Sequence, residues 1–494
     1  MSTAPDLVSP PTDPVAGLDP KHAVWVGGRG RAARDSKTFT VEDPATRLPV
    51  AEVADGGSAE ARDAVDAAAS ALTDWSATPA RTRAEALRTA YELMLANTDR
   101  LSALISWENG KALPDARAEV SYAAEFFRWF SEEAVRTEGT YGSAPAGGAR
   151  TVVTHRPVGV AALVTPWNFP AAMATRKIAP ALAAGCTVVL KPAAETPLTA
   201  LAVARILQQA GVPDGVVNLV PTTAAAEVVT TWLEDPRVRK VSFTGSTGVG
   251  RTLLRQAADR VMNASMELGG NAPFVVTEDA DLEAAVAGAM VAKFRNGGQA
   301  CTAANRFYVH ADVVDDFVDR FGAAVESLRV GPAFQEGTQI GPMISARARD
   351  ELRATVDAAV AAGARKSHQA AAPDGGYFFP PTVLTDVAPD AALLDQELFG
   401  PVAPVVTWTD ESDLLRQLNA TEYGLAAYVY SGDLRRAIRL GETIEAGMVG
   451  INRGVVSDPS APFGGVKQSG LGREGARDGI REFQETQYLS VDWP

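Results

Sequence analysis

Short apolar segments alternate with helix-length segments from residue 157 onward, and this alternation restricts the fold more than any other feature. The apolar segments are of strand length and comprise residues 158–164, 186–192, 216–221 and 240–245. The segments between them have helical periodicity over about 10–15 residues. Gly185 is placed to end the first helix, and Thr196 with Pro197 to begin the second, the threonine hydroxyl serving as its cap. The pattern predicts an α/β fold with a doubly wound parallel sheet.

The rest of the chain predicts a second α/β unit and a helical lead-in. Apolar segments 265–270 and 272–276 close the first half. Helices are then expected at 281–296, 311–328, 346–363, 411–420 and 433–446, and strands at 306–310, 404–408, 426–430 and 447–451. The stretch from about 20 to 150 reads as a helical lead-in, with helices at 57–75 and 79–110 and a linker-like patch at 142–148. The tail 488–493 reads as a strand, and residues 1–20, rich in Pro, Ser, Thr and Asp, as a disordered leader.

Composition excludes several classes of function. The 46 basic residues are outnumbered by 60 acidic ones, and the net charge of −14 argues against a nucleic-acid partner. No apolar run approaches the roughly 18 residues of a membrane span, and the first residues lack the pattern of a secretory signal. The four histidines are scattered, so no metal site is expected. Two cysteines exclude a disulfide framework and suit a reducing cytoplasm.

Four polar or glycine-rich segments follow predicted strands of the first unit, at 165–170, 191–197, 243–250 and 266–270. The carboxyl ends of parallel strands meet at one edge of a sheet, where ligands of such folds bind. Segment 243–250 also opens a helix, so its backbone N–H groups suit a pyrophosphate, although a plain strand–helix turn is the alternative. The four segments together predict a binding site at this edge.

Three residues in these contexts suit nucleophilic chemistry. Cys301 follows Gly297 and Gly298, which permit a tight turn and a close approach of ligand, whereas a lone cysteine is more often an inert core residue. Cys186, among apolar neighbours, is expected to be inert. Glu267 is either a base for the thiol or a member of an ion pair, and Asn168 either caps a helix or stabilises an oxyanion.

With these residues assembled, the chain resembles the aldehyde dehydrogenase superfamily over about residues 20–490, and within it the succinate-semialdehyde dehydrogenase branch. The resemblance rests on Thr165-Pro-Trp-Asn-Phe-Pro170, Lys191-Pro, Phe243-Thr-Gly-Ser-Thr-Gly248, Met266-Glu-Leu-Gly-Gly270, Gly298-Gln-Ala-Cys301, Glu397-Leu-Phe-Gly-Pro401 and Pro462-Phe-Gly-Gly465. It implies a nucleophile, Cys301, a general base, Glu267, and an oxyanion donor, Asn168. An aldehyde would form a thiohemiacetal and then a thioester with the cysteine, and water activated by the glutamate would release the acid.

The resemblance also implies binding residues and domains. Cofactor binding is expected at Thr165, Pro166, Trp167, Lys191, Ala194, Glu195, Gly245, Ser246, Leu268, Glu397 and Phe399, and substrate binding at Phe169, Arg176, Arg295, Ser457 and Phe463. A cofactor-binding domain is expected at 21–137 and 157–268, a catalytic domain at 269–479, and bridging strands at 138–156 and 480–494 that form a homodimer or homotetramer.

Two positions depart from the pattern of the superfamily. Members that prefer NAD often have a glutamate where this chain has Ala194, and the glutamate here comes one residue later, as Glu195. The cofactor is therefore expected to be NADP or NAD, with the preference open. Some members carry a second cysteine where this chain has Ala303, so that a disulfide with the nucleophile is excluded here.

The substrate expectation depends on Arg176 and Arg295, whose guanidinium groups suit the carboxylate of a short aldehyde acid. Structural ion pairs are the alternative for both, and Lys177 and Lys293 are expected to be solvated. Other aldehydes, including glutarate semialdehyde, stay open as substrates. A CoA-acylating enzyme is less favoured because Glu267 is present. A non-catalytic relative and a thiol hydrolase are the alternatives from other classes.

Overall fold

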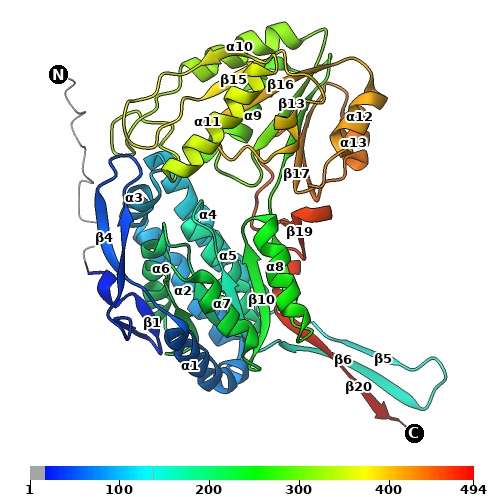
Figure 1. Ribbon diagram of the computed structural model, residues 1–494. Coiled ribbons are helices and arrows are strands. Elements are labelled where there is room, and N and C mark those ends of the chain that lie inside the picture. Colours follow the sequence, from blue (N-terminus) through cyan, green and yellow to red (C-terminus); the bar gives the residue numbers. More distant parts are fainter. Residues whose placement is uncertain (1–16, 137, 494) are drawn as a thin grey trace.

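The computed structural model describes residues 17–136 and 138–493 (Figure 1). One lobe contains α1 to α8, a second contains α9 to α13, and a three-stranded sheet projects from the first lobe. Residues 1–16 of the expected leader lie outside the described residues, and Pro20 begins the short 3-10 helix η1 (Pro20–His22). No helix among the described residues is long and apolar enough to cross a membrane.

The first lobe is built on an eight-stranded sheet of order β19-β11-β10-β7-β8-β9-β1-β2. Its strands are β1 (Val24–Val26), β2 (Arg29–Arg31), β7 (Val160–Val164), β8 (Thr187–Lys191), β9 (Val217–Leu219), β10 (Val238–Thr244), β11 (Asn263–Glu267) and β19 (Gly470–Leu471). The five central strands, β11 to β9, are parallel. The register pairs Val164 with Lys191 and Thr244 with Glu267, so the carboxyl ends align. The predicted parallel sheet and its shared edge are confirmed, with antiparallel strands added at both margins.

The lead-in is not wholly helical, so the prediction for residues 20–54 was wrong. Besides β1 and β2 it contains β3 (Thr38–Glu42) and β4 (Pro49–Ala54), which form a separate hairpin. These strands have three to six residues, and β2 is exposed throughout. So short a strand without an apolar alternation has no periodic signal in the sequence.

In the described part of the chain, eight helices of ten or more residues surround the first sheet, and four of them come from the lead-in. They are α1 (Ser58–Ala77), α2 (Ala80–Ala96), α3 (Thr98–Asn109), α4 (Leu113–Glu133), α5 (Pro170–Ala184), α6 (Pro197–Gln209), α7 (Ala225–Glu234) and α8 (Thr247–Ala258). The helix predicted at 79–110 is two helices, interrupted at Asn97. Gly185 ends α5 in the left-handed conformation, as predicted. Thr196 does not cap α6 with its hydroxyl; the Glu108 carboxylate instead accepts hydrogen bonds from Leu198 N and Thr199 N.

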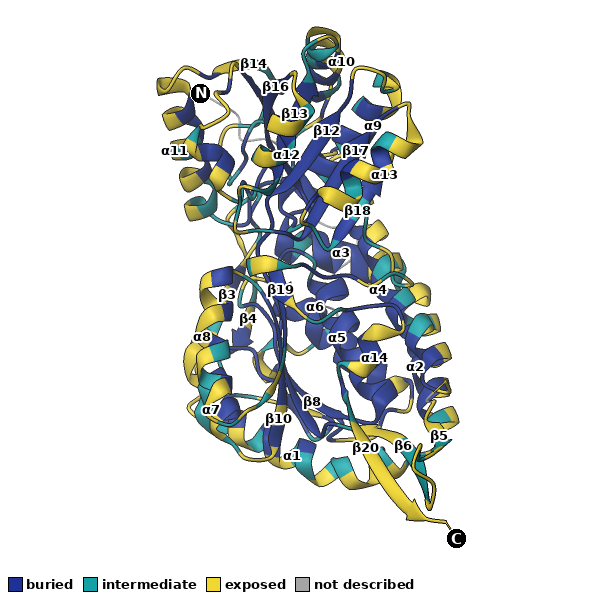
Figure 2. Cartoon of the chain, turned by 90° about the vertical axis from the view of Figure 1, so that its right-hand side faces the viewer, coloured by how far each residue is buried: buried dark blue, intermediate teal, exposed yellow. Residues whose placement is uncertain are grey.

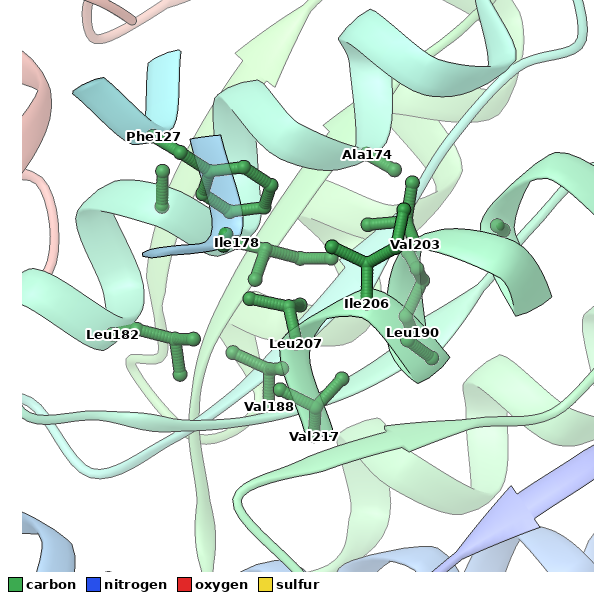
Figure 3. Packing of buried hydrophobic residues seen from close by; sticks show 14 of the residues in the cluster. Phe127, Ala174, Ile178, Leu182, Val188, Leu190, Val203, Ile206, Leu207 and Val217 are labelled. Carbon is green, nitrogen blue, oxygen red and sulfur yellow. The ribbon is translucent and has the colours of Figure 1, made fainter. Parts of the chain in front are cut away.

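The core of the first lobe surrounds α5, every residue of which is buried. Figure 3 shows Phe127 of α4 and Ile178 of α5 packing toward Leu207 of α6 and Val188 of β8. A helix that is buried on all sides must satisfy its charged side chains internally. Arg176 and Lys177, the two cations of α5, therefore need partners inside the protein, and these are described below.

The second lobe has a seven-stranded sheet of order β14-β15-β16-β13-β12-β17-β18. Its strands are β12 (Ala272–Val276), β13 (Ala304–His310), β14 (Arg365–Gln369), β15 (Thr382–Thr385), β16 (Val402–Trp408), β17 (Ala426–Tyr430) and β18 (Met448–Ile451). Its helices are α9 (Leu282–Phe294), α10 (Val314–Glu326), α11 (Ala346–Ala361), α12 (Glu411–Asn419) and α13 (Leu434–Thr443), with α14 (Asp478–Arg481) following near the C-terminus. The predicted second α/β unit is confirmed. Segment 272–276 does not close the first half, because as β12 it lies inside this sheet.

The third sheet has the order β20-β6-β5 and joins β5 (Thr140–Ser143), β6 (Ala149–Pro157) and β20 (Gln484–Asp492). The strand predicted for the tail is confirmed, and it pairs with β6 from Gln484 opposite Pro157 to Asp492 opposite Ala149. The patch 142–148 is not a linker, because it forms the end of β5 and the turn into β6. Figure 2 shows that β20 is exposed along most of its length.

Candidate active site

Cys301 lies at the end of a backbone turn that joins α9 to β13. The 3-10 helix η2 (Arg295–Gly298) contains Asn296, Gly297 and Gly298 with φ of 54°, 60° and 75°. A Cβ on Gly298 would lie 2.3 Å from the carbonyl oxygen of Gly400. The tight turn predicted from the two glycines is therefore confirmed, and it brings the cysteine beside the edge of the first sheet.

Cys301 keeps part of its surface open to a cleft, yet the packing around it raises the pKa of its thiol to about 12. Burial is the main cause, while the positive charges of Arg176 and Arg295 act in the opposite direction. The thiol is thus protonated at neutral pH, and a base is needed to form the thiolate. Cys186, in contrast, is fully buried against the carbonyl oxygen of Phe483 at 3.3 Å, as expected for an inert residue.

Glu267 is buried at the end of β11, and neither of its carboxylate oxygens has a hydrogen-bond partner among the described residues. Burial and the nearby negative charge of Glu474 raise its pKa well above the ordinary value. An unpartnered carboxylate with a raised pKa is a stronger base than an ordinary glutamate and is suited to accept a proton. No cation among the described residues pairs directly with Glu267, so the ion-pair alternative has no support in this part of the chain.

The glycines after Glu267 make room for protein rather than for a ligand. A Cβ on Gly270 would lie 2.1 Å from the carbonyl oxygen of Cys301, and one on Gly269 would lie 2.8 Å from a carboxylate oxygen of Glu397. The strand end therefore packs directly against the nucleophile turn. This contact brings the strand end that carries Glu267 beside Cys301, and besides burial the negative charge of Glu267 is one of the causes that raise the pKa of the thiol.

Asn168 lies in the turn between β7 and α5. Its Nδ2 donates to the carbonyl oxygen of Gln299 at 3.0 Å, and its Oδ1 has no partner among the described residues. Phe169, not Asn168, is the residue that precedes the helix, and the asparagine side chain does not cap it. The helix-cap alternative is therefore excluded. The Asn168 amide is instead held at the carbonyl oxygen of Gln299, two residues before Cys301.

A cavity of about 210 Å³ lies between the lobes at the predicted sheet edge. Among the residues in its wall are Pro166, Trp167, Asn168, Gly245, Ser246, Leu268, Cys301, Glu397 and Phe399. Residues from three of the four predicted segments thus line one cleft together with Cys301.

The turn before α8 presents the free backbone that an anionic group needs. Ser246 precedes the helix, and space extends beyond 4 Å from a Cβ built on Gly248. A Cβ on Gly250 would instead lie 2.4 Å from Leu268, so this glycine serves the packing of helix on strand. Open space therefore lies beside the N-terminus of α8 at Gly248, where the sequence predicts a pyrophosphate.

Other predicted cofactor residues lie at or beside this edge. Lys191 ends β8, and burial lowers its pKa to about 8. Ala194 is half-buried and Glu195 exposed, and Thr165 N donates to the Lys191 carbonyl oxygen at 3.1 Å. Burial raises the pKa of Glu397 to about 7, and its carboxylate accepts a hydrogen bond from Gly270 N at 2.9 Å.

Arg176 makes an ion pair inside the protein. Its Nε lies 2.5 Å from a carboxylate oxygen of Glu474, and its guanidinium stacks over the ring of Phe463 at 4.1 Å. Lys177 Nζ lies 2.5 Å from the other oxygen of Glu474. The expectation that Lys177 and Lys293 are solvated was wrong, since both are fully buried. Their helices pack inside the lobes, where each ammonium needs a protein partner.

Arg295 differs from Arg176 in its surroundings. It is half-buried, makes no ion pair with any described residue, and lies 5.5 Å from the ring of Phe169. Its charge and that of Arg176 both act on Cys301. Ser457 is half-buried in the loop after β18, and its contact with the arginines stays a prediction.

The sequence analysis did not identify four charged residues near the site: Lys111, Asp115, Glu119 and Glu474. Asp115 and Glu119 are four residues apart on α4, so their carboxylates lie on one face of the helix. This spacing is visible in the sequence and could have identified the pair. The described residues contain no cluster of His, Cys, Asp and Glu that could hold a metal ion.

The aldehyde dehydrogenase family model matches residues 31–489. The chain belongs to the aldehyde dehydrogenase family. It is 53% identical to a succinate-semialdehyde dehydrogenase of Paenarthrobacter nicotinovorans, over 90% of this chain and 99% of that protein. It is 46% identical to an NADP(+) succinate-semialdehyde dehydrogenase of Escherichia coli strain K12, over 94% of this chain and 97% of that protein.

Solved structures of aldehyde dehydrogenases have the same fold. The succinate-semialdehyde dehydrogenase of Burkholderia pseudomallei superimposes with a TM-score of 0.94 at 46% identity, covering 96% of this chain and 99% of that one. The expected aldehyde dehydrogenase fold, with two parallel-sheet lobes and a small β region, is confirmed.

Proposed function

We propose that this aldehyde dehydrogenase oxidises succinate semialdehyde to succinate with NADP or NAD. The observation that carries the substrate class is Arg295, a cation without an ion-pair partner among the described residues, whose charge acts on Cys301. The names of similar proteins support the same class. Glutarate semialdehyde is the alternative, because relatives from two Pseudomonas species carry the name glutarate-semialdehyde dehydrogenase.

The residues divide the chemistry as follows. Glu267 removes the proton of the Cys301 thiol, and the thiolate attacks the aldehyde carbon. The Asn168 amide, with the Cys301 backbone N–H, stabilises the oxyanion of the resulting thiohemiacetal. A dinucleotide bound in the cleft would supply the hydride acceptor that converts the thiohemiacetal on Cys301 into a thioester. Glu267 releases the thiol proton to solvent and then takes a proton from water, and the hydroxide displaces the Cys301 thiolate to give the acid.

The cofactor fits the cleft at the edge of the first sheet. The N-terminus of α8, with Ser246 and the open backbone at Gly248, suits the pyrophosphate. Glu397 is a hydrogen-bond acceptor in the cleft wall for the nicotinamide ribose, and Lys191 serves the adenosine ribose hydroxyls. Ala194 leaves space for a 2′-phosphate, which a carboxylate at that position would repel.

In this proposal residues 21–137 and 157–268 form the cofactor-binding domain and residues 269–479 the catalytic domain. Residues 138–156 and 480–494 join copies of the chain into a homodimer or homotetramer. Neither β20 nor β5 pairs with a further described strand at the edge of the three-stranded sheet, and β20 exposes Tyr488, Leu489 and Val491. The two free cysteines suit a cytoplasmic location.

The test compares a charged and an uncharged aldehyde of similar length. Replacing Arg295 by alanine removes a charged hydrogen-bond donor, worth roughly 1.5–3 kcal/mol. The kcat/KM for succinate semialdehyde should fall about 10- to 150-fold, and that for butanal should change little. Arg176→Ala is measured in parallel, and Arg255→Ala, at an exposed residue of α8, is the matched control.

The comparison also identifies the failure of each part. Equal losses for both aldehydes would mean that Arg295 holds the site together, and the substrate would then be an unspecified aldehyde. A higher kcat/KM of the unmodified enzyme for glutarate semialdehyde than for succinate semialdehyde would favour the alternative.

A further inference from the structure

Lys111 is a buried cation that the proposed chemistry does not use. It lies between α3 and α4, and its side chain is 1% exposed. Its Nζ lies 2.5 Å from Oε2 of Glu119, 2.6 Å from the carbonyl oxygen of Asn168 and 4.1 Å from the centre of the Phe169 ring. An ammonium has three N–H groups, and these three neighbours can all accept from it. Two of them belong to the turn that carries the oxyanion donor.

Glu119 holds the same turn from its other end. Its Oε1 accepts hydrogen bonds from Ala171 N at 2.8 Å and from Ala172 N at 3.2 Å, at the start of α5. A carboxylate at a helix N-terminus satisfies free N–H groups and lies favourably in the helix dipole. The ion pair of Lys111 and Glu119 therefore contacts the backbone of this turn at Asn168 and again at the start of α5.

The nucleophile turn is tied to the same point. Asn296 Nδ2 donates to the carbonyl oxygens of Asn168 and Gln299, each at 3.0 Å. The Asn168 amide donates to that same Gln299 oxygen. Asp115, one turn before Glu119 on α4, accepts from Asn296 N at 2.8 Å. One helix of the first lobe thus holds the two segments that must meet across the cleft.

We propose that Lys111 and Glu119 are positioning residues, which fix the Asn168 turn against the Cys301 turn so that the amide meets the developing oxyanion. The inference rests on the proposed function, in which Asn168 is the oxyanion donor. Two buried ions are retained only where hydrogen bonds compensate their desolvation, and here the compensating groups are those of the catalytic turn. A donor displaced by about 1 Å loses about 10²-fold in rate.

A double-mutant cycle between Lys111 and Asn168 tests this inference. Asn168→Ala should lower kcat by about 10²–10³-fold. Lys111→Met should lower kcat by about 10- to 100-fold, because the amide remains but is no longer held. The dissociation constant for NADP, measured by protein fluorescence, should stay within about twofold. In the double variant Lys111→Met should cost less than about threefold beyond Asn168→Ala, and losses that multiply would overturn the inference.

A double substitution that removes both charges, here called the neutral pair, distinguishes a positioning role from simple charge compensation. Lys111→Met alone leaves Glu119 as an unpaired buried charge, whereas Lys111→Met with Glu119→Gln leaves none. This neutral pair should keep the loss in kcat, and a return to the activity of the unmodified enzyme would refute the proposal. If Lys111→Met does not fold, the neutral pair takes its place in the cycle.

Two further arms complete the design. Lys366→Met removes an exposed lysine paired with Asp357 at 3.2 Å and should leave kcat unchanged. If Asn168→Ala itself costs nothing, the oxyanion role in the proposed function fails, and the inference fails with it. If Asn168→Ala is costly but its effect multiplies with that of Lys111→Met, the inference alone fails.

Discussion

Glu474→Gln should move the acid limb of the pH–rate profile to lower pH. Glu474 lies beside Glu267 and pairs with Arg176 and Lys177, at 2.5 Å in each case. Its negative charge is one cause of the raised pKa of Glu267. The substitution removes this repulsion and leaves two cations free to stabilise the Glu267 carboxylate. Both effects lower the pKa of the general base.

The same substitution should lower stability, with a definite pH dependence. Removing one partner of a buried ion pair costs about 3–5 kcal/mol. The folded pKa of Glu474 is lowered, so its stabilising contribution is present above the unfolded value and is lost as the pH falls through the folded pKa. The difference in unfolding free energy between the two proteins should therefore be largest near neutrality and decrease in acid.

Two measurements check this prediction. The kcat is recorded between about pH 5 and pH 9, with single-turnover experiments to identify the hydrolytic step. Urea unfolding at neutral and acidic pH gives the stability difference. Glu125→Gln, in an exposed pair 3.5 Å from Arg128, is the matched control and should cost at most about 1 kcal/mol. An acid limb of Glu474→Gln that stays in place, or moves to higher pH, would refute the reasoning.

Three other predictions concern single residues of the cleft. Cys301→Ala should abolish dehydrogenase turnover while fluorescence titration still detects cofactor binding; activity near that of the unmodified enzyme would exclude the cysteine as nucleophile. Glu267→Gln should slow thioester hydrolysis by about 10²–10⁴-fold, seen as a burst of reduced cofactor followed by slow turnover; an unchanged steady-state rate would place the base elsewhere. Ala194→Glu should shift the ratio of kcat/KM values toward NAD, and an unchanged ratio would mean that residue 194 does not face the ribose.

The sequence by itself determined the elements whose signal is local. The apolar segments became β7 and β8 because a strand buried on both faces needs an apolar run. The end of α5 at Gly185 and the turn before Cys301 were predictable because each depends on the backbone freedom of glycine at positive φ. Glu267 and Asn168 were identifiable because the first ends a strand and the second follows one, at carboxyl ends that lie at the shared edge.

Only the tertiary structure decided which charges are buried and what surrounds them. Lys177 can be buried because its ammonium pairs with Glu474, which lies 297 residues away in the sequence. The cap of α6 comes from Glu108 of another helix rather than from the adjacent Thr196. Lys111 reaches Asn168 only because α4 packs on α5. The periodicity of a segment reports which face is apolar, whereas the pairing of a buried charge depends on groups that folding brings from distant parts of the chain.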